Sequence, residues 1–172
     1  MSYDLFTAIF NALPLAHTLN GKVFICHGGL FDKDGIKVSE INKVNRFNQP
    51  PESGIFNELL WSDPSELPGR SPSKRGTGVA FGPDVVENFL KDNNMELLVR
   101  SHEVKEKGYY VEPNGKCITI FSAPNYCDSV GNLGAFITFK EDMKPEFTTF
   151  EAVPHPPIRP MAYSSGFGGM GF

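Results

Sequence analysis

The chain has 172 residues, of which 40% are hydrophobic and 21% are charged. This composition supports one folded domain and excludes an intrinsically disordered chain. The formal net charge of −4, without runs of lysine or arginine, argues against nucleic-acid binding and against a polybasic membrane segment, and no apolar run is long enough to span a bilayer. The three cysteines have no C-x-x-C spacing, which indicates reduced thiols of an intracellular protein.

The first half of the chain predicts two helices and one strand. Apolar residues recur at helical spacing over residues 5–13, so we expect the chain to open in an amphipathic helix. Residues 23–26 form a short, β-prone apolar run that predicts a buried strand. A short helix is expected over residues 39–44, with Ser39 as its N-cap. Residues 46–80 are rich in Pro, Gly, Ser, Asn and Asp and predict a long loop, of a length that is usually functional or disordered.

The second half predicts a helix followed by strands. The helix begins at Gly82-Pro83-Asp84, because proline is favoured at the first helical position, and its buried face is Val85, Val86, Phe89 and Leu90. Strands are expected over residues 97–99, 109–111, 117–121, 135–139 and 147–152. We therefore divide the chain into a folded part, residues 1–152, and a Pro- and Gly-rich extended tail, residues 153–172.

Two histidines occur in the same local context. His27 and His102 each follow an apolar strand and begin a loop. In α/β sheets, side chains at the carboxyl ends of strands converge on one rim, where ligands collect. The glycines at positions 28 and 29 would also allow a ligand to approach the backbone. The pair is either a set of metal ligands or two histidines hydrogen-bonded at loop starts, and spacing alone favours the second interpretation.

Three further side chains have a functional and a structural interpretation each. Arg75 lies beside Gly76, where its guanidinium could hold a phosphate through two parallel hydrogen bonds, or could belong to a solvated basic turn. Trp61 is either a core residue or a wall of a binding groove. Tyr126 follows a predicted strand and either overhangs a site or belongs to an ordinary Pro- and Asn-containing turn.

For most of the remaining polar candidates, the sequence favours a structural role. Arg100 is expected to form an ion pair with a nearby carboxylate. Asp63 precedes Pro64 and either forms a turn or orients another functional group. Cys127 is expected to be an unreactive thiol, because no histidine, lysine or helix start is tied to it by sequence.

Six short segments, taken in order, resemble the C-terminal motifs of the serine/threonine phosphoprotein phosphatase family. They are His27-Gly28-Gly29, Leu59-Leu60-Trp61-Ser62-Asp63-Pro64, Lys74-Arg75-Gly76, Phe81-Gly82, Arg100-Ser101-His102-Glu103 and Ser122-Ala123-Pro124-Asn125-Tyr126-Cys127. The ordered set is specific, although no single segment is. Residues 49–54, 100–105, 152–156 and 160–163 further resemble the family member that carries an N-terminal tetratricopeptide domain.

The resemblance implies an α/β fold in which mixed sheets form a β-sandwich flanked by helices, with this chain as the C-terminal half of the catalytic domain. It implies hydrolysis of phosphoserine and phosphothreonine by a hydroxide that two divalent metal ions activate. Manganese is the expected metal, with iron, zinc or magnesium as alternatives. The implied roles are metal binding for His27 and His102, phosphate binding for Arg75, and a place along the substrate pocket for Tyr126, Trp61, Glu103, Val104 and Phe121.

The family pattern also contains Gly-Asp-x-His-Gly, Gly-Asp-x-x-Asp-Arg-Gly and Gly-Asn-His-Glu segments, which do not occur in these 172 residues. We expect them upstream of Met1 in a parent protein. The chain alone should then be inactive and should expose apolar faces that the missing half covers. The resemblance implies phosphoprotein substrates, an autoinhibitory tetratricopeptide domain, chaperone partners, and a cytoplasmic and nuclear location. The alternative is a non-catalytic phosphopeptide- or partner-binding module.

Overall fold

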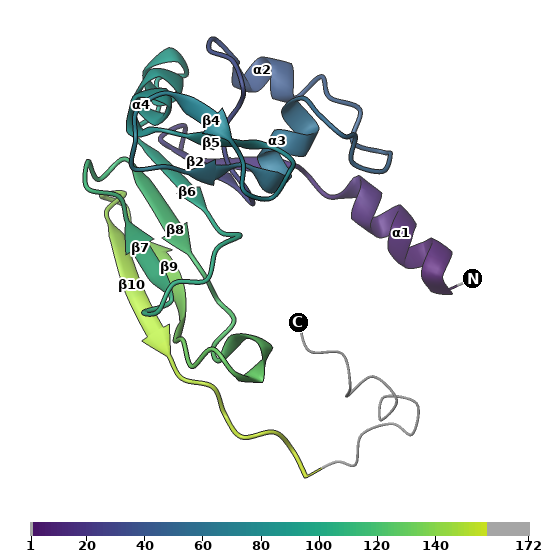
Figure 1. The fold of residues 1–172 in the computed structure, drawn as a ribbon, viewed down its shortest axis with the longest axis vertical. Coiled ribbons are helices and arrows are strands. Elements are labelled where there is room, and N and C mark those ends of the chain that lie inside the picture. Colours follow the sequence, from purple (N-terminus) through teal and green to yellow (C-terminus); the bar gives the residue numbers. More distant parts are fainter. Residues whose placement is uncertain (1, 158–172) are drawn as a thin grey trace.

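A five-stranded mixed sheet is the centre of the fold (Figure 1). The computed structural model describes residues 2–157. The strand order is β1-β2-β6-β8-β7, with β1 Ala16–Leu19, β2 Val23–Cys26, β6 Leu97–Arg100, β7 Tyr109–Val111 and β8 Cys117–Ile120. Strands β2, β6 and β8 are parallel, and the two edge strands are antiparallel to their neighbours. The carboxyl ends of β2 and β6 therefore lie side by side at one edge of the sheet.

The central strands are continuous apolar runs because both faces of the sheet are covered. One face packs through Phe24 and Leu98 against helix α4 (Pro83–Asp92), whose buried residues are those that the sequence predicts. The other face packs through Val99 and Ile118 against the hairpin of β9 (Gly134–Phe139) and β10 (Pro145–Phe150). The molecule thus has a helical layer, a central sheet and a second, two-stranded sheet.

The predicted loop over residues 46–80 is wrong. It contains helix α3 (Ile55–Trp61) and a three-stranded sheet in the order β3-β5-β4, with β3 Asp63–Pro64, β4 Arg70–Pro72 and β5 Val79–Phe81. These strands are two or three residues long, too short to show an alternating pattern. Strand β1 was likewise not predicted, because it is a mostly exposed edge held by its pairing with β2.

The N-cap that we predict for the short second helix is also wrong. Helix α2 spans Val38–Ile41 and its N-cap is Lys37. The carboxylate of Glu40 accepts a hydrogen bond from the backbone N–H of Lys37, and Asn93 accepts one from the N–H of Val38. The first turn is therefore satisfied by groups other than the Ser39 hydroxyl.

The predicted strands of the C-terminal half are confirmed, with small shifts of their bounds. Strand β10 covers residues 145–150, two residues earlier than predicted. Residues 153–157 form no helix or strand, and residues 158–172 lie outside the described part of the chain. The division into a folded part and a tail at residue 153 therefore stays a prediction.

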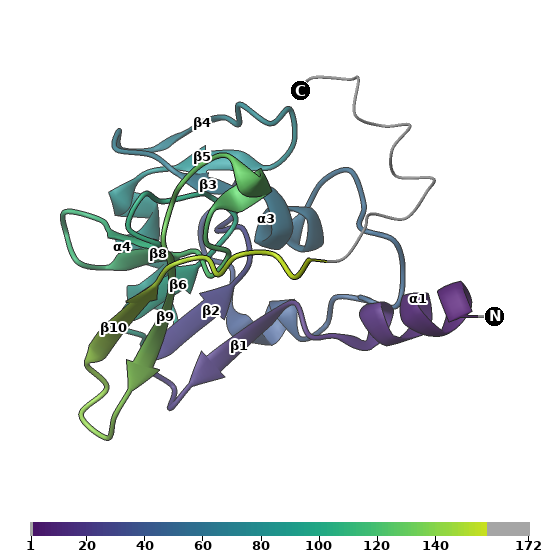
Figure 2. The ribbon, with the colours of Figure 1, turned by 90° about the horizontal axis from the view of Figure 1, so that it is seen from below.

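Helix α1 (Ser2–Ala12) projects away from the sheet, as Figures 1 and 2 both show. It is the predicted N-terminal helix, but it has no buried residue. Its apolar side chains Leu5, Phe6, Ile9 and Phe10 are 56–63% exposed. Such a contiguous apolar surface is typical of an interface. Among the described residues, neither this helix nor any other has the length and apolar character needed to cross a membrane.

Candidate functional site

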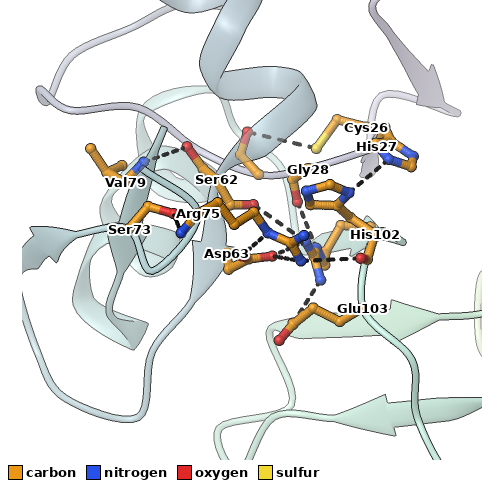
Figure 3. Close-up of polar contacts among 12 residues, drawn as sticks. Cys26, His27, Gly28, Ser62, Asp63, Ser73, Arg75, Val79, His102 and Glu103 are labelled. Atoms are coloured by element: carbon orange, nitrogen blue, oxygen red, sulfur yellow. Dashed lines mark hydrogen bonds and ion pairs between the residues drawn. The ribbon is translucent and has the colours of Figure 1, made fainter. Parts of the chain in front are cut away.

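His27 and His102 meet at the carboxyl ends of β2 and β6 (Figure 3). Although they are 75 positions apart in the sequence, the Nε2 atom of His27 lies 3.0 Å from the Nδ1 atom of His102. His102 has a φ of +67°, in the left-handed region that non-glycine residues rarely adopt. Such a conformation costs on the order of 1–3 kcal/mol and is concentrated at functional sites, which favours the functional interpretation of this pair.

Both imidazoles are neutral at neutral pH. Burial and the charges of Arg75 and of His27 lower the pKa of His102 to about 4. Burial, followed by the charges of Arg100 and Arg75, also lowers the pKa of His27. A neutral imidazole offers a nitrogen lone pair, and metal–nitrogen distances are about 2.0–2.1 Å, so one metal ion can contact both of the facing nitrogens.

The second ring nitrogen of His102 supports the same metal-binding arrangement. Its Nε2 is buried and has no hydrogen-bond partner in the described part of the chain. A proton on Nε2 leaves Nδ1, the atom that faces His27, as the lone-pair nitrogen. The pair therefore fits a metal ion, but only as part of its coordination. Within residues 2–157, no group of three or more His, Cys, Asp or Glu side chains is arranged to hold one.

The glycines after His27 bring helix α3 to the site. A Cβ atom on Gly28 would lie 2.4 Å from the backbone carbon of Leu60, and one on Gly29 would lie 2.1 Å from the Phe81 ring. The lack of side chains at these glycines therefore allows other parts of the protein to pack against the backbone, and not a ligand as the sequence suggests. The close packing of α3 places Trp61, at the end of that helix, with its ring centre 5.4 Å from that of His102. Trp61 is 39% exposed, so it is not a core residue, and its place along a substrate pocket stays a prediction.

Arg75 reaches the same place from the loop between β4 and β5. Its Nε donates to Asp63 Oδ2 at 2.6 Å, and its Nη2 donates to the backbone carbonyl of His102 at 3.2 Å. The hydrogen bond with Asp63 raises the pKa of Arg75. The side chain keeps 32% of its surface exposed. A guanidinium is thus held next to the histidine pair, with part of its surface open to an anion.

Arg100 ties together the loops that carry these residues. Its side chain is completely buried, and it donates to the carbonyl of Gly28 at 2.6 Å and to the carbonyl of Ser62 at 3.3 Å. It also forms ion pairs with Asp63 at 2.8 Å and with Glu103 at 2.7 Å. The predicted ion pair is confirmed. The role of Arg100 in joining these loops was not predicted from the sequence, although a charged residue at the end of an apolar strand is a signal for such a role.

Asp63 shares its carboxylate between two arginines. Burial alone would raise its pKa, but hydrogen bonds and charge from Arg75 and Arg100 outweigh burial and hold the pKa below its ordinary value. The carboxylate is therefore ionised at neutral pH and orients both guanidinium groups. Of the two interpretations from sequence, the structure favours the orienting one.

The other predicted pocket residues are Tyr126, Phe121, Val104 and Glu103. The ring of Tyr126 packs edge-on against Phe121, with 5.1 Å between ring centres. Tyr126 and Val104 are both exposed. Among the described residues, no hydrogen bond or ring contact joins Tyr126 or Phe121 to the histidines, so their place in a substrate pocket stays a prediction. Glu103 does approach the site, through Arg100.

The family model described as calcineurin-like phosphoesterase matches residues 1–106, more than half of the chain. The chain belongs to the calcineurin-like phosphoesterase family. This family is dependent on divalent metals, which agrees with the facing imidazoles of His27 and His102. The predicted metallophosphoesterase-type α/β fold is confirmed.

The sequence of this calcineurin-like phosphoesterase is also similar to the sequences of known protein phosphatases. It is 63% identical over 165 residues to serine/threonine-protein phosphatase 5 of Arabidopsis thaliana, covering 95% of this chain and 31% of that protein. It is 52% identical over 164 residues to serine/threonine-protein phosphatase 5 of Homo sapiens, covering 95% of this chain and 33% of that protein. The chain thus spans about a third of the length of these relatives.

A solved structure gives the same result. A protein serine/threonine phosphatase from Saccharomyces cerevisiae, described as similar to human phosphatase PP5, matches with a TM-score of 0.86 and 44% identity. The match covers 94% of this chain and 54% of that one. The resemblance to serine/threonine phosphoprotein phosphatases, and to protein phosphatase 5 among them, is confirmed.

Proposed function

We propose that this chain is the C-terminal part of the catalytic domain of a metal-dependent protein serine/threonine phosphatase. The observation that carries the proposal is the 3.0 Å approach of His27 and His102 beside the guanidinium of Arg75. Ligands for a metal ion beside a cation that can bind phosphate are two of the elements that metal-assisted phosphoester hydrolysis uses.

His27 Nε2 and His102 Nδ1 are the atoms that would bind one of two divalent ions, with manganese proposed and iron, zinc or magnesium compatible with the same ligand type. Divalent ions at such a site lower the pKa of a bound water and neutralise phosphoryl oxygens. The other ligands would come from the part of the parent protein that precedes this chain. The exposed apolar residues of α1 are suited to the interface with that part.

The chain's own residues bind and position the substrate. Arg75, oriented by Asp63, would hold the phosphoryl oxygens through its planar guanidinium. Trp61 would restrict water beside His102. Arg100 fixes the two histidine loops relative to each other through Gly28 and Glu103. Tyr126, Phe121, Val104 and Glu103 are proposed to border the substrate further along the rim.

The likeness to protein phosphatase 5 supports phosphoproteins as substrates of the parent protein. It also leads us to propose an autoinhibitory tetratricopeptide domain and chaperone partners in the parent, and a cytoplasmic and nuclear location. All of these proposals concern the longer protein.

A phosphatase assay on a phosphoserine peptide with added manganese tests the proposal. We expect no turnover from this chain alone, and turnover when it is mixed with the preceding part of the parent's catalytic domain. Phosphopeptide binding without turnover in the mixture would instead indicate the non-catalytic binding module. Turnover by the chain alone at the rate of the mixture would refute the expected division of the active site.

A further inference from the structure

We propose that a cavity on the far edge of the sheet binds a small organic cation with an apolar body, an amine or amidine carried on a ring. The cavity lies between β3, the start of α4 and the turn that joins β7 to β8. Its volume is about 330 Å³, at the lower end of the range of about 300–1,000 Å³ that small-molecule sites occupy.

The walls of this cavity are apolar and stiff. They are Pro64, Phe81, Pro83, Val86 and Pro113. Phe81 and Val86 are core residues, at 0% and 2% exposure, so the inner wall is fixed by the core of the domain. Prolines in three separate segments of the lining limit the backbone motion that would otherwise close an empty apolar space. The cavity therefore favours a compact ring or branched chain over a flexible polar ligand.

Two carboxylates line the same cavity and lack a cation. They are Glu66, after β3, and Glu112, after β7, and neither carboxylate forms an ion pair or hydrogen bond in the described part of the chain. Burial raises the pKa of Glu112, and the negative charges of Glu103 and Glu66 add to that effect. A partly buried carboxylate without a partner is unfavourable, and a ligand cation would relieve it.

The nearby positive charges are engaged elsewhere. The charges of Lys105 and Arg100 both act on Glu112, but their nitrogens form ion pairs with Glu103, at 3.3 Å and 2.7 Å. The thiol of Cys117, which also lines the cavity, is kept neutral because burial raises its pKa to about 12. The cavity thus offers an apolar interior and a net negative rim, which is complementary to an apolar cation.

The cavity is separate from the candidate active site. The described residues that line it include none of His27, His102 and Arg75. It lies beside β7, at the opposite edge of the central sheet from β1. Its ligand therefore does not depend on the proposed phosphatase function.

Three probes of matched size test the proposal on this chain: 2-phenylethylammonium, neutral 2-phenylethanol and anionic 3-phenylpropionate. Each is titrated into ¹⁵N-labelled chain at about pH 8, where carboxylates are ionised. We expect the ammonium to shift the amide signals of Ser65, Glu112 and Asn114 in a saturable way. The alcohol should bind about tenfold more weakly, because it lacks the charge-assisted contact, and the carboxylate should not bind.

Substitutions then locate the charge. Glu112→Gln should weaken ammonium binding about tenfold and leave binding of the alcohol unchanged, whereas Glu141→Gln, an exposed carboxylate between β9 and β10, should change neither. Equal affinity for the three probes, the absence of saturable shifts, or shifts confined to other residues would each overturn the proposal. The probe series on the unaltered chain decides the matter even if a variant does not fold.

Discussion

Arg100 and Asp63 form an ion pair of 2.8 Å in which the arginine side chain is fully buried and the aspartate side chain is 18% exposed. Removing one partner of a buried pair leaves an uncompensated charge. We predict that Asp63→Asn lowers the free energy of unfolding of this chain by about 3 kcal/mol, measured by urea denaturation.

The matched control for this prediction is an exposed ion pair. Lys140 and Glu146 are 65% and 55% exposed, and exposed pairs contribute about 0–1 kcal/mol. Glu146→Gln should therefore change the stability little. Equal losses in the two variants would show that Arg100 does not depend on Asp63 for its charge balance.

Glu58 gives the stability of the chain a pH dependence. Its side chain is only 4% exposed, and burial, followed by the charge of Asp32, raises its pKa to about 7. Because the folded state binds this proton more tightly than the unfolded state, stability falls as the pH rises from about 4.5 to about 7. We predict that Glu58→Gln removes a loss of about 3 kcal/mol across this interval.

Urea denaturation at several pH values measures this effect. The unaltered chain should be less stable at pH 8 than at pH 5 by more than the Gln variant is. Parallel pH profiles for the two chains would contradict the assignment of this titration to Glu58.

The strand ends next to the histidines could be predicted from sequence, because residues 23–26 and 97–99 are apolar runs that stop at a polar residue. Helix α4 was predictable because it starts at a proline and its apolar residues recur at helical spacing. The sheet of β3, β4 and β5 was not, since its strands are held by pairing with one another and not by their own patterns.

The site was only partly predictable. That His27 and His102 each follow a strand is visible in the sequence, but their 3.0 Å approach depends on β2 and β6 being parallel neighbours. The sharing of Asp63 between Arg75 and Arg100 joins three segments of the chain, and no local pattern specifies it. Roles assigned by resemblance to Tyr126, Phe121 and Val104 stay predictions.

The proposed role of Arg75 in phosphate binding can be tested with a substitution that keeps the positive charge. In the parent enzyme, Arg75→Lys should lower kcat/KM by roughly ten- to a hundredfold, because a lysine cannot make the two parallel hydrogen bonds of the guanidinium. Metal content and unfolding midpoint should be unchanged. Wild-type kcat/KM at unchanged metal content would remove Arg75 from phosphate binding.

The exposed face of α1 can be tested by its assembly with the preceding part of the catalytic domain. Phe6 and Phe10 are 59% and 61% exposed, and burying a Phe side chain contributes about 1.5–3 kcal/mol. We predict that Phe6→Ser with Phe10→Ser weakens that association at least about a hundredfold, measured by calorimetry. An unchanged affinity in the double variant would exclude this face of α1 from the interface.

His27 and His102 are proposed to be ligands of one metal ion. Metal content of the assembled catalytic domain, measured by inductively coupled plasma mass spectrometry, tests it most directly. We predict two divalent ions in the unaltered protein, loss of one of them and of activity in His27→Ala and in His102→Ala, and no loss in His155→Ala, whose side chain is 79% exposed. Two ions retained in both His27→Ala and His102→Ala would contradict the account.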